Sequence, residues 1–97
     1  MLVIVSYDVS TINRAGQRRL NRIAKICLNY GTRVQNSVFE CLVDNAQWTK
    51  LKAELLKTFV AEEDSLRFYF LGNNWERRVE HHGTKETPNL ESDTLIV

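Results

Sequence analysis

MLVIVSYD, residues 1–8, opens the chain and decides how it folds. The four consecutive aliphatic side chains at positions 2–5, most of them β-branched, predict a short strand that is buried on both faces. This strand ends on a single carboxylate, Asp8. An acid at the end of a buried central strand lies at the rim of a sheet, where chemistry is often placed, so Asp8 is the first candidate functional residue.

Two amphipathic helices are predicted after this strand. Residues 14–30 carry apolar side chains at i, i+3, i+4 and i+7, and we expect Gly31 to end that helix as a C′ glycine. Several polar residues between positions 9 and 13 are able to cap its start, and the sequence does not choose among them. The second helix is expected to begin at Asp44, which forms a capping box with Gln47.

The remaining segments are strand-like. Residues 65–71 alternate between two faces, and the apolar triplet 95–97 is suited to a short edge strand. Residues 32–43 read either as one bent strand or as two strands broken near positions 36–37. The order of elements is β-α-β(-β)-α-β plus a tail, which predicts a single domain over 1–97: a ferredoxin-like α+β sandwich.

Two helices cover only one face of such a sheet. Both the first strand and residues 65–71 present apolar side chains on both of their faces. An open apolar sheet face of several hundred Å² is an association site. We therefore expect a second copy of the chain to cover it, in a two-fold homodimer.

The composition argues against a secreted or membrane-spanning protein, but it does not decide for or against a nucleic-acid partner. The net charge of +1 argues neither for nor against nucleic acid. The apolar run after Met1 is too short for a signal peptide or a membrane span, so a cytoplasmic location without membrane contact is expected. Cys27 and Cys41 form no metal-binding pattern and are expected to be buried, reduced thiols.

Charge is segregated along the chain. No acidic residue occurs between Asp8 and Glu40. The basic residues in that interval are Arg14, Arg18, Arg19, Arg22, Lys25 and Arg33. Most of the helical ones fall within about 80° of each other on a helical wheel, without i,i+4 partners of opposite sign. Arginine suits phosphate oxygens, so we predict that Arg14, Arg18, Arg19 and Arg33 contact nucleic-acid phosphates, with a solvated helix face as the alternative.

Asp8 has two interpretations, a turn residue at a strand end or a ligand for a hard cation. One carboxylate is a poor site for Mg²⁺ or Mn²⁺ by itself. In a two-fold dimer, however, two Asp8 side chains could share one ion that polarises a phosphodiester and acidifies a bound water. A two-metal nuclease site would need more carboxylates than this region offers.

Three further residues are supporting candidates. Tyr7 either donates to a phosphate or packs with its hydroxyl at the rim, and Ser37 lies in the same predicted region. Phe39 is expected in the core or a dimer interface rather than as a platform for base stacking. His81 and His82 are expected to be surface or tail residues, because no metal ligand lies at a suitable spacing.

Several stretches together resemble the CRISPR-associated protein 2 family, the small subunit of the spacer-acquisition machinery. The resemblance rests on the hydrophobic strand 2–9 with Tyr7-Asp8, on the basic helix with Arg14, Arg18 and Arg19, and on GTRVQNSVFE at 31–40, which is the most specific piece. Residues 71–75 and 79–83 are similar to members from type I-C systems. The resemblance spans nearly the whole chain.

The resemblance implies a ferredoxin-like homodimer in which an extra C-terminal strand, within the tail at about 75–97, packs on the partner. It implies Asp8 as the catalytic, metal-binding acid of a Mg²⁺-dependent endonuclease acting on single-stranded RNA or double-stranded DNA. It also implies work with the CRISPR-associated integrase, with the dimer as a scaffold for incoming DNA. Asp44 and the acidic run 62–64 are exposed candidates for integrase contact.

Three alternatives stand beside this reading. A purely structural DNA-binding adaptor would keep Asp8 only to organise the interface. A stand-alone VapD-like toxin ribonuclease would cleave RNA without the integrase. A small-molecule-sensing ferredoxin-like domain would have no DNA affinity, and it leaves the acid-free basic stretch unexplained.

Overall fold

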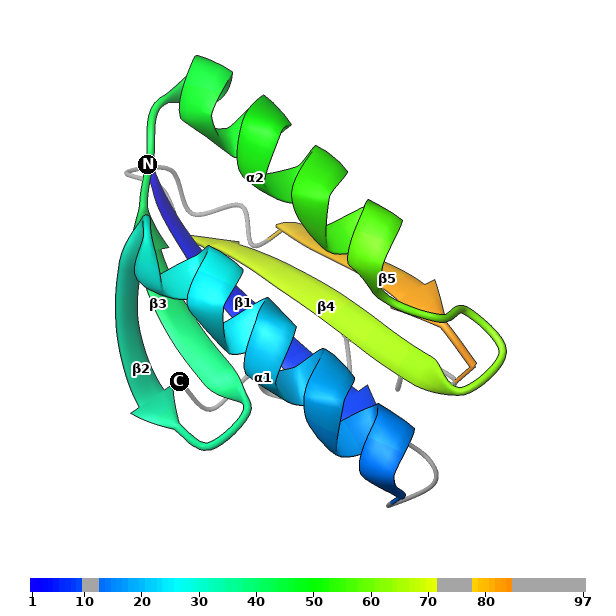
Figure 1. Ribbon diagram of the computed structural model, residues 1–97. Helices are drawn as coiled ribbons and strands as arrows, with labels where there is room; N and C mark the ends of the chain where they lie inside the picture. Colours follow the sequence, from blue (N-terminus) through cyan, green and yellow to red (C-terminus); the bar gives the residue numbers. More distant parts are fainter. Residues whose placement is uncertain (10–12, 72–77, 85–97) are drawn as a thin grey trace.

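The computed structural model describes residues 1–9, 13–71 and 78–84. The elements in chain order are β1 (Leu2–Val9), α1 (Arg14–Leu28), β2 (Gly31–Gln35), β3 (Val38–Leu42), α2 (Asn45–Thr58), β4 (Asp64–Leu71) and β5 (Arg78–Gly83). The strands form one antiparallel sheet in the order β2-β3-β1-β4-β5, and both helices lie on the same face of it (Figure 1). The predicted ferredoxin-like α+β sandwich is confirmed.

β1 is the central strand, and its two faces differ. Val3, Val5 and Tyr7 point under the helices and are fully buried, whereas Leu2, Ile4 and Ser6 on the opposite face are only partly covered. The core between sheet and helices is completed by Phe39, Cys41, Leu66 and Phe68 from the neighbouring strands and by Leu20, Ile23, Cys27, Leu51 and Leu55 from the helices. The first strand is therefore fully buried on one face and partly buried on the other.

α1 begins where a side chain caps it. Asn13 is the N-cap, and its Oδ1 accepts a hydrogen bond from the Gly16 amide at 2.7 Å. The helix ends at Leu28, two residues earlier than predicted, with Asn29 as its C-cap. The expectation that Gly31 is a C′ glycine is wrong, because Gly31 already belongs to β2 and its φ angle is not positive. A glycine is needed there for another reason: a Cβ would overlap the Glu40 carbonyl oxygen across the β2–β3 pair.

Residues 32–43 form two strands, which confirms the second of the two predicted alternatives. β2 and β3 make a hairpin that turns at Asn36 and Ser37, with an irregular register between Arg33 and Gln35. The Ser37 carbonyl accepts a hydrogen bond from the Tyr7 amide at 2.9 Å, which fixes the turn against the end of β1. The hairpin turn is thereby placed beside Asp8.

α2 has the predicted capping box. The Asp44 side chain accepts from the Gln47 amide at 2.7 Å, and the Gln47 side chain accepts from the Asp44 amide at 2.9 Å. The Trp48 ring makes edge-to-face contacts with Phe68 and Phe70, which hold the helix over β4.

The tail is only partly described. Residues 78–83, predicted as part of the tail, form β5 on β4 of the same chain. The edge strand expected at 95–97 lies outside the described residues, and packing of the tail on a partner stays a prediction.

Candidate functional site around Asp8

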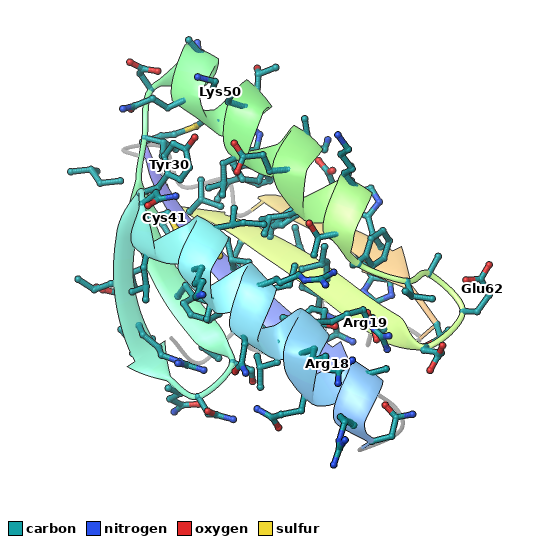
Figure 2. The ribbon with its side chains drawn as sticks, in the orientation of Figure 1. Arg18, Arg19, Tyr30, Cys41, Lys50 and Glu62 are labelled. Carbon is teal, nitrogen blue, oxygen red and sulfur yellow. The ribbon has the colours of Figure 1, made fainter. Side chains whose placement is uncertain are left out.

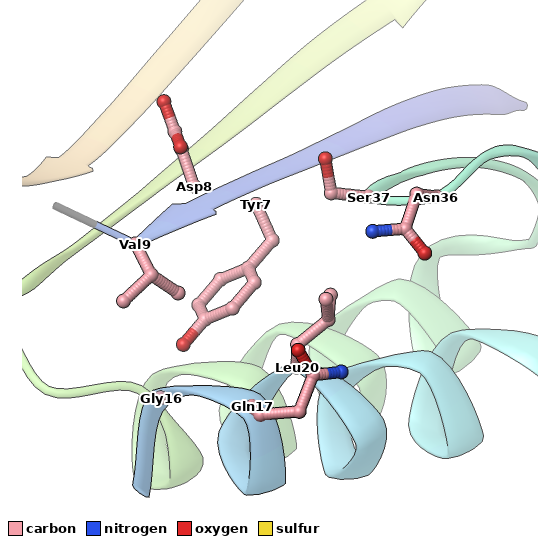
Figure 3. A pocket seen from close by; sticks show the side chains of 8 residues that line it. All are labelled: Tyr7, Asp8, Val9, Gly16, Gln17, Leu20, Asn36 and Ser37. Carbon is pink, nitrogen blue, oxygen red and sulfur yellow. The ribbon is translucent and has the colours of Figure 1, made fainter. Parts of the chain in front are cut away.

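Asp8 projects from the sheet face that the helices leave open. Its neighbour Tyr7 points toward α1, and successive strand residues point to opposite faces, so the two side chains diverge (Figure 3). Asp8 is exposed, and its cross-strand partner on β4 is Ser65. The acid therefore lies at an accessible rim, as predicted.

A recess of about 200 Å³ opens on the helix side of this rim. It is lined by Tyr7, Asp8, Val9, Gly16, Gln17, Leu20, Asn36 and Ser37 (Figure 3). Three predicted site residues, Tyr7, Asp8 and Ser37, thus come together here. They do so because the end of β1, the first turns of α1 and the β2–β3 turn meet at one corner of the fold.

The Tyr7 hydroxyl does not face this rim. It is buried and donates to Asp64 Oδ2 at 2.6 Å. Arg19 holds the same carboxylate with two hydrogen bonds, Nε to Oδ2 at 2.8 Å and Nη2 to Oδ1 at 3.0 Å. The Val60 amide donates to Oδ2 as well, at 2.9 Å. The expectation that Tyr7 donates a hydrogen bond to a phosphate is therefore wrong, because its hydroxyl donates to the buried Asp64 instead.

This network corrects two other expectations. Arg19 is only 9% exposed, so it does not belong to the exposed basic face. In Figure 2 it lies on the side of α1 that faces the start of β4. Asp64 is fully buried, so it is not an exposed candidate for integrase contact, although Glu62 is exposed. The helical spacing could have shown this. Position 19 lies one turn before the apolar position 23 and two turns before 27, so it shares the helix face that packs on the core.

The same contacts shift two ionisation equilibria. Burial alone would raise the pKa of Asp64, but hydrogen bonds from Arg19, Tyr7 and the Val60 amide more than offset it, and the pKa lies below its usual value. Burial, followed by the hydrogen bond to Asp64, raises the pKa of Tyr7. The carboxylate is thus ionised and the phenol neutral at pH 7.

The other basic residues of α1 lie on its exposed face, as predicted. Arg14, Arg18, Arg22 and Lys25 are all exposed on α1. Within residues 13–71, none of these four side chains forms an ion pair with an acid. Toward the described part of the chain, these four charges therefore have no acidic partner.

Arg33 and Phe39 form a unit on the hairpin. The Arg33 guanidinium donates to the Asn36 carbonyl through Nε and Nη2, at 2.8 and 2.5 Å, and its carbon lies 5.5 Å from the centre of the Phe39 ring. Phe39 is fully buried, which confirms its place in the core. Arg33 is exposed and holds the turn that carries Ser37.

A second, smaller recess of about 120 Å³ opens on the other side of Asp8. It is lined by Ser6, Asp8, Ser65 and Arg67. Ser6, Ser65 and Arg67 carry no motif that marks them in the sequence. Strand parity could have found them, because alternate residues of β1 and β4 share the open face with Asp8.

Candidate metal ligands are few around Asp8. Among the residues that the structure describes, no three His, Cys, Asp or Glu side chains are grouped so that they could hold a metal ion. Cys27 and Cys41 are buried free thiols in the core, as predicted. In the described ranges, no helix has the length and apolar character needed to cross a bilayer.

Comparisons with known proteins agree with this architecture. A family model described as CRISPR associated protein Cas2 matches residues 1–79. A protein of Chlorobaculum tepidum named CRISPR-associated endoribonuclease Cas2 is 63% identical over 97 residues and is covered, like this chain, to 100%. One of Halalkalibacterium halodurans named CRISPR-associated endonuclease Cas2 is 55% identical, with 99% of both chains covered. The crystal structure of Streptococcus pyogenes Cas2 at pH 6.5 superposes with a TM-score of 0.72 and 51% identity, over 77% of this chain and 90% of that one.

Proposed function

Since the chain belongs to the CRISPR associated protein Cas2 family, we propose that it is a nucleic-acid-binding homodimer of CRISPR adaptation with metal-dependent endonuclease capacity at Asp8. The observation that carries the proposal is the position of Asp8, exposed at the end of the central strand between two recesses. Relatives named as an endoribonuclease and an endonuclease support a nuclease activity. We infer that its substrate is single-stranded RNA or double-stranded DNA.

The exposed face of α1 supplies the affinity for nucleic acid. Arg14, Arg18, Arg22 and Lys25 place four positive charges along one helix. Such a row binds phosphates regardless of base sequence and releases counterions as it does so. Arg33 at the hairpin turn extends this basic surface toward the recess that contains Asp8.

The Asp8 carboxylate suits a hard cation by its chemistry. It is exposed and offers oxygen ligands of the kind that Mg²⁺ and Mn²⁺ prefer. One carboxylate per chain fits a cation that is shared with substrate phosphate, with water and with Asp8 of a second copy. When bound, such an ion polarises the phosphodiester and makes water a better nucleophile. The protein's part is to hold the phosphate in line with this carboxylate.

A second copy also completes the fold. The helices cover one sheet face, and the other presents a row of apolar side chains that crosses three strands: Leu42, Leu2 and Leu71 are register neighbours. Covering this row in a two-fold dimer would bring two Asp8 rims and two basic helices into one particle. That particle is the proposed scaffold for DNA alongside the CRISPR-associated integrase, in the cytoplasm.

Asp8→Ala tests the catalytic part of the proposal. We expect cleavage of labelled single-stranded RNA and double-stranded DNA in Mg²⁺ or Mn²⁺ to be lost, because the cation loses the Asp8 carboxylate of each chain. Binding of the same substrates, measured by fluorescence anisotropy, should persist because α1 is unchanged. Glu62→Ala, which removes an exposed carboxylate beyond α2, serves as the control and should cleave as the wild type does.

Cleavage that survives Asp8→Ala in highly purified protein would show the site assignment to be wrong. One acid per chain, with no three-ligand group among the described residues, favours a second candidate: a structural DNA-binding adaptor. That adaptor predicts no metal-dependent cleavage by the wild type, with duplex binding intact.

A further inference from the structure

We propose that Ser6, Ser65 and Arg67 form a phosphate-binding seat on the open face of the sheet, in which Arg67 binds a non-bridging oxygen of the phosphodiester presented to Asp8. This inference deepens the proposed function and rests on it where it refers to cleavage. Binding of a phosphodiester at Arg67 can be tested without any cleavage.

The register of the sheet assembles this seat. Across the β1–β4 pair, Ser6 lies opposite Arg67 and Asp8 lies opposite Ser65. Directly paired residues project from the same face, and this is the face away from the helices, because the intervening Tyr7 and Leu66 are in the helix-covered core. The same four side chains line the recess of about 120 Å³.

β5 orients the arginine from its other side. His81 is the register partner of Arg67 across the β4–β5 pair. The Arg67 Nε donates to His81 Nδ1 at 3.3 Å, and since a guanidinium only donates, Nδ1 accepts. Both side chains are partly buried, so the contact is sheltered. A guanidinium carries five N–H donors, and this bond uses the one on Nε, so it sets the plane of the fork.

The chemistry of the lining selects phosphate rather than a base. A guanidinium fork matches two oxygens of a phosphate, and the hydroxyls of Ser6 and Ser65 are further donors. Among the residues that the structure describes, no aromatic side chain lines the recess, so this part of the chain offers no platform on which bases stack. Of the parts of a nucleotide, the phosphodiester is therefore the one that this lining fits.

Asp8 makes the seat dependent on the cation. Its carboxylate lines the recess together with Arg67, and it would repel a phosphate unless a cation lies between them. In the absence of metal, Asp8→Asn should therefore bind a phosphodiester more tightly than the wild type does. The substitution should thus raise the affinity for a phosphodiester, whereas it should abolish cleavage.

The test uses the full chain with ¹⁵N labelling and uridylyl-(3′,5′)-uridine, a probe with one phosphodiester that is too short to reach the basic face of α1 as well. The titration is performed on Asp8→Asn protein in EDTA. We expect saturable shifts of the Arg67 Nε–H and His81 ring resonances, and none with uridine, which lacks the phosphate. The Arg67 signal is assigned by its loss in Arg67→Lys.

Variants separate this role from a general charge effect. On the Asp8→Asn background, Arg67→Ala should weaken dinucleotide binding at least ~10-fold, as expected for loss of a charged hydrogen bond. Arg67→Lys should restore part of it. Lys50→Ala removes one exposed charge from the distant start of α2 and should change nothing (Figure 2).

Two outcomes would overturn the proposal. One is equal shifts with uridine and the dinucleotide, or none with either. The other is unchanged dinucleotide affinity in Arg67→Ala together with an altered oligomeric state by light scattering, which would make Arg67 a contact between copies of the chain. Absence of cleavage in the wild type would count against the nuclease proposal and leave the titration result standing.

Discussion

Asp64 is a buried carboxylate, although its position in an acidic run predicts an exposed one. It closes a run of three acids at 62–64, yet it is fully buried, with donors from α1, β1 and the α2–β4 connection. A buried charge is tolerated when it is paired and its lone pairs are used, as they are here. By tying α1 to the ends of β1 and β4, this contact keeps the first turns of α1 against the recess beside Asp8.

Asp64→Asn is expected to destabilise the fold by about 3–5 kcal/mol at pH 7, because the buried Arg19 loses its closest carboxylate and keeps only the more distant Glu63, 3.6 Å away. The folded-state pKa of Asp64 is lowered, so its stabilisation is complete above the unfolded pKa of about 3.9 and is lost as the pH falls through the folded pKa. Urea unfolding of both proteins from pH 7 to pH 3 measures this difference.

The gap between wild type and Asp64→Asn should therefore narrow below about pH 4. Glu62→Gln, at an exposed position in the same acidic run, is the matched control and should stay within about 0.5 kcal/mol of the wild type. A gap that is equally wide at pH 7 and pH 3 would mean that the Asp64 charge does not contribute to stability.

α1 gives opposite roles to adjacent arginines. Arg18 lies on the exposed face, whereas Arg19 turns 100° around the helix and binds Asp64. Only the exposed set, with Arg14, Arg22 and Lys25, is suited to phosphate contact. The helix thus joins the core by one face, and in the proposed function the other face binds nucleic acid.

Salt dependence measures the role of that exposed face. Arg14→Ala and Arg18→Ala should each reduce the slope of log K against log salt concentration by about 0.9 on duplex DNA, because each removes one phosphate contact. Lys50→Ala removes the same charge from α2 and should leave the slope unchanged. If all three variants share the wild-type slope, the α1 face is solvated and does not bind the duplex.

The elements that sequence predicted correctly are those specified by neighbouring residues. The first strand follows from consecutive aliphatic residues, and the start of α2 follows from the reciprocal bonds of Asp44 and Gln47. Long-range contacts account for the misses: Arg19 meets Asp64 45 positions away, and Gly31 is required by the approach of Glu40 on β3. Asp8 could be predicted because it ends an apolar run in the sequence. The position of Arg67 beside it depends on the register of the β1–β4 pair, which the sequence does not show.

At the scale of the whole molecule, the sheet has one face covered and one open. Leu42 is 73% exposed, although its neighbour Cys41 is fully buried under the helices. Its register partner Leu2 extends the same apolar surface onto the central strand. Asp8 projects from the same open face near the other end of β1, so a copy that covers this face would contribute to the catalytic proposal as well as to stability.

Leu42→Lys is expected to weaken the proposed homodimer about 100-fold, because two-fold symmetry would remove one buried leucine from each copy and add two charges. Size-exclusion chromatography with light scattering over a micromolar dilution series measures the dissociation constant. Leu28→Lys places the same charge at an exposed leucine at the end of α1, on the helix layer, and should leave the dimer intact. A wild type that is monomeric at micromolar concentration would contradict the dimer itself. Dissociation by Leu28→Lys but not by Leu42→Lys would place the interface on the helices, where two Asp8 side chains on the open face could not share an ion.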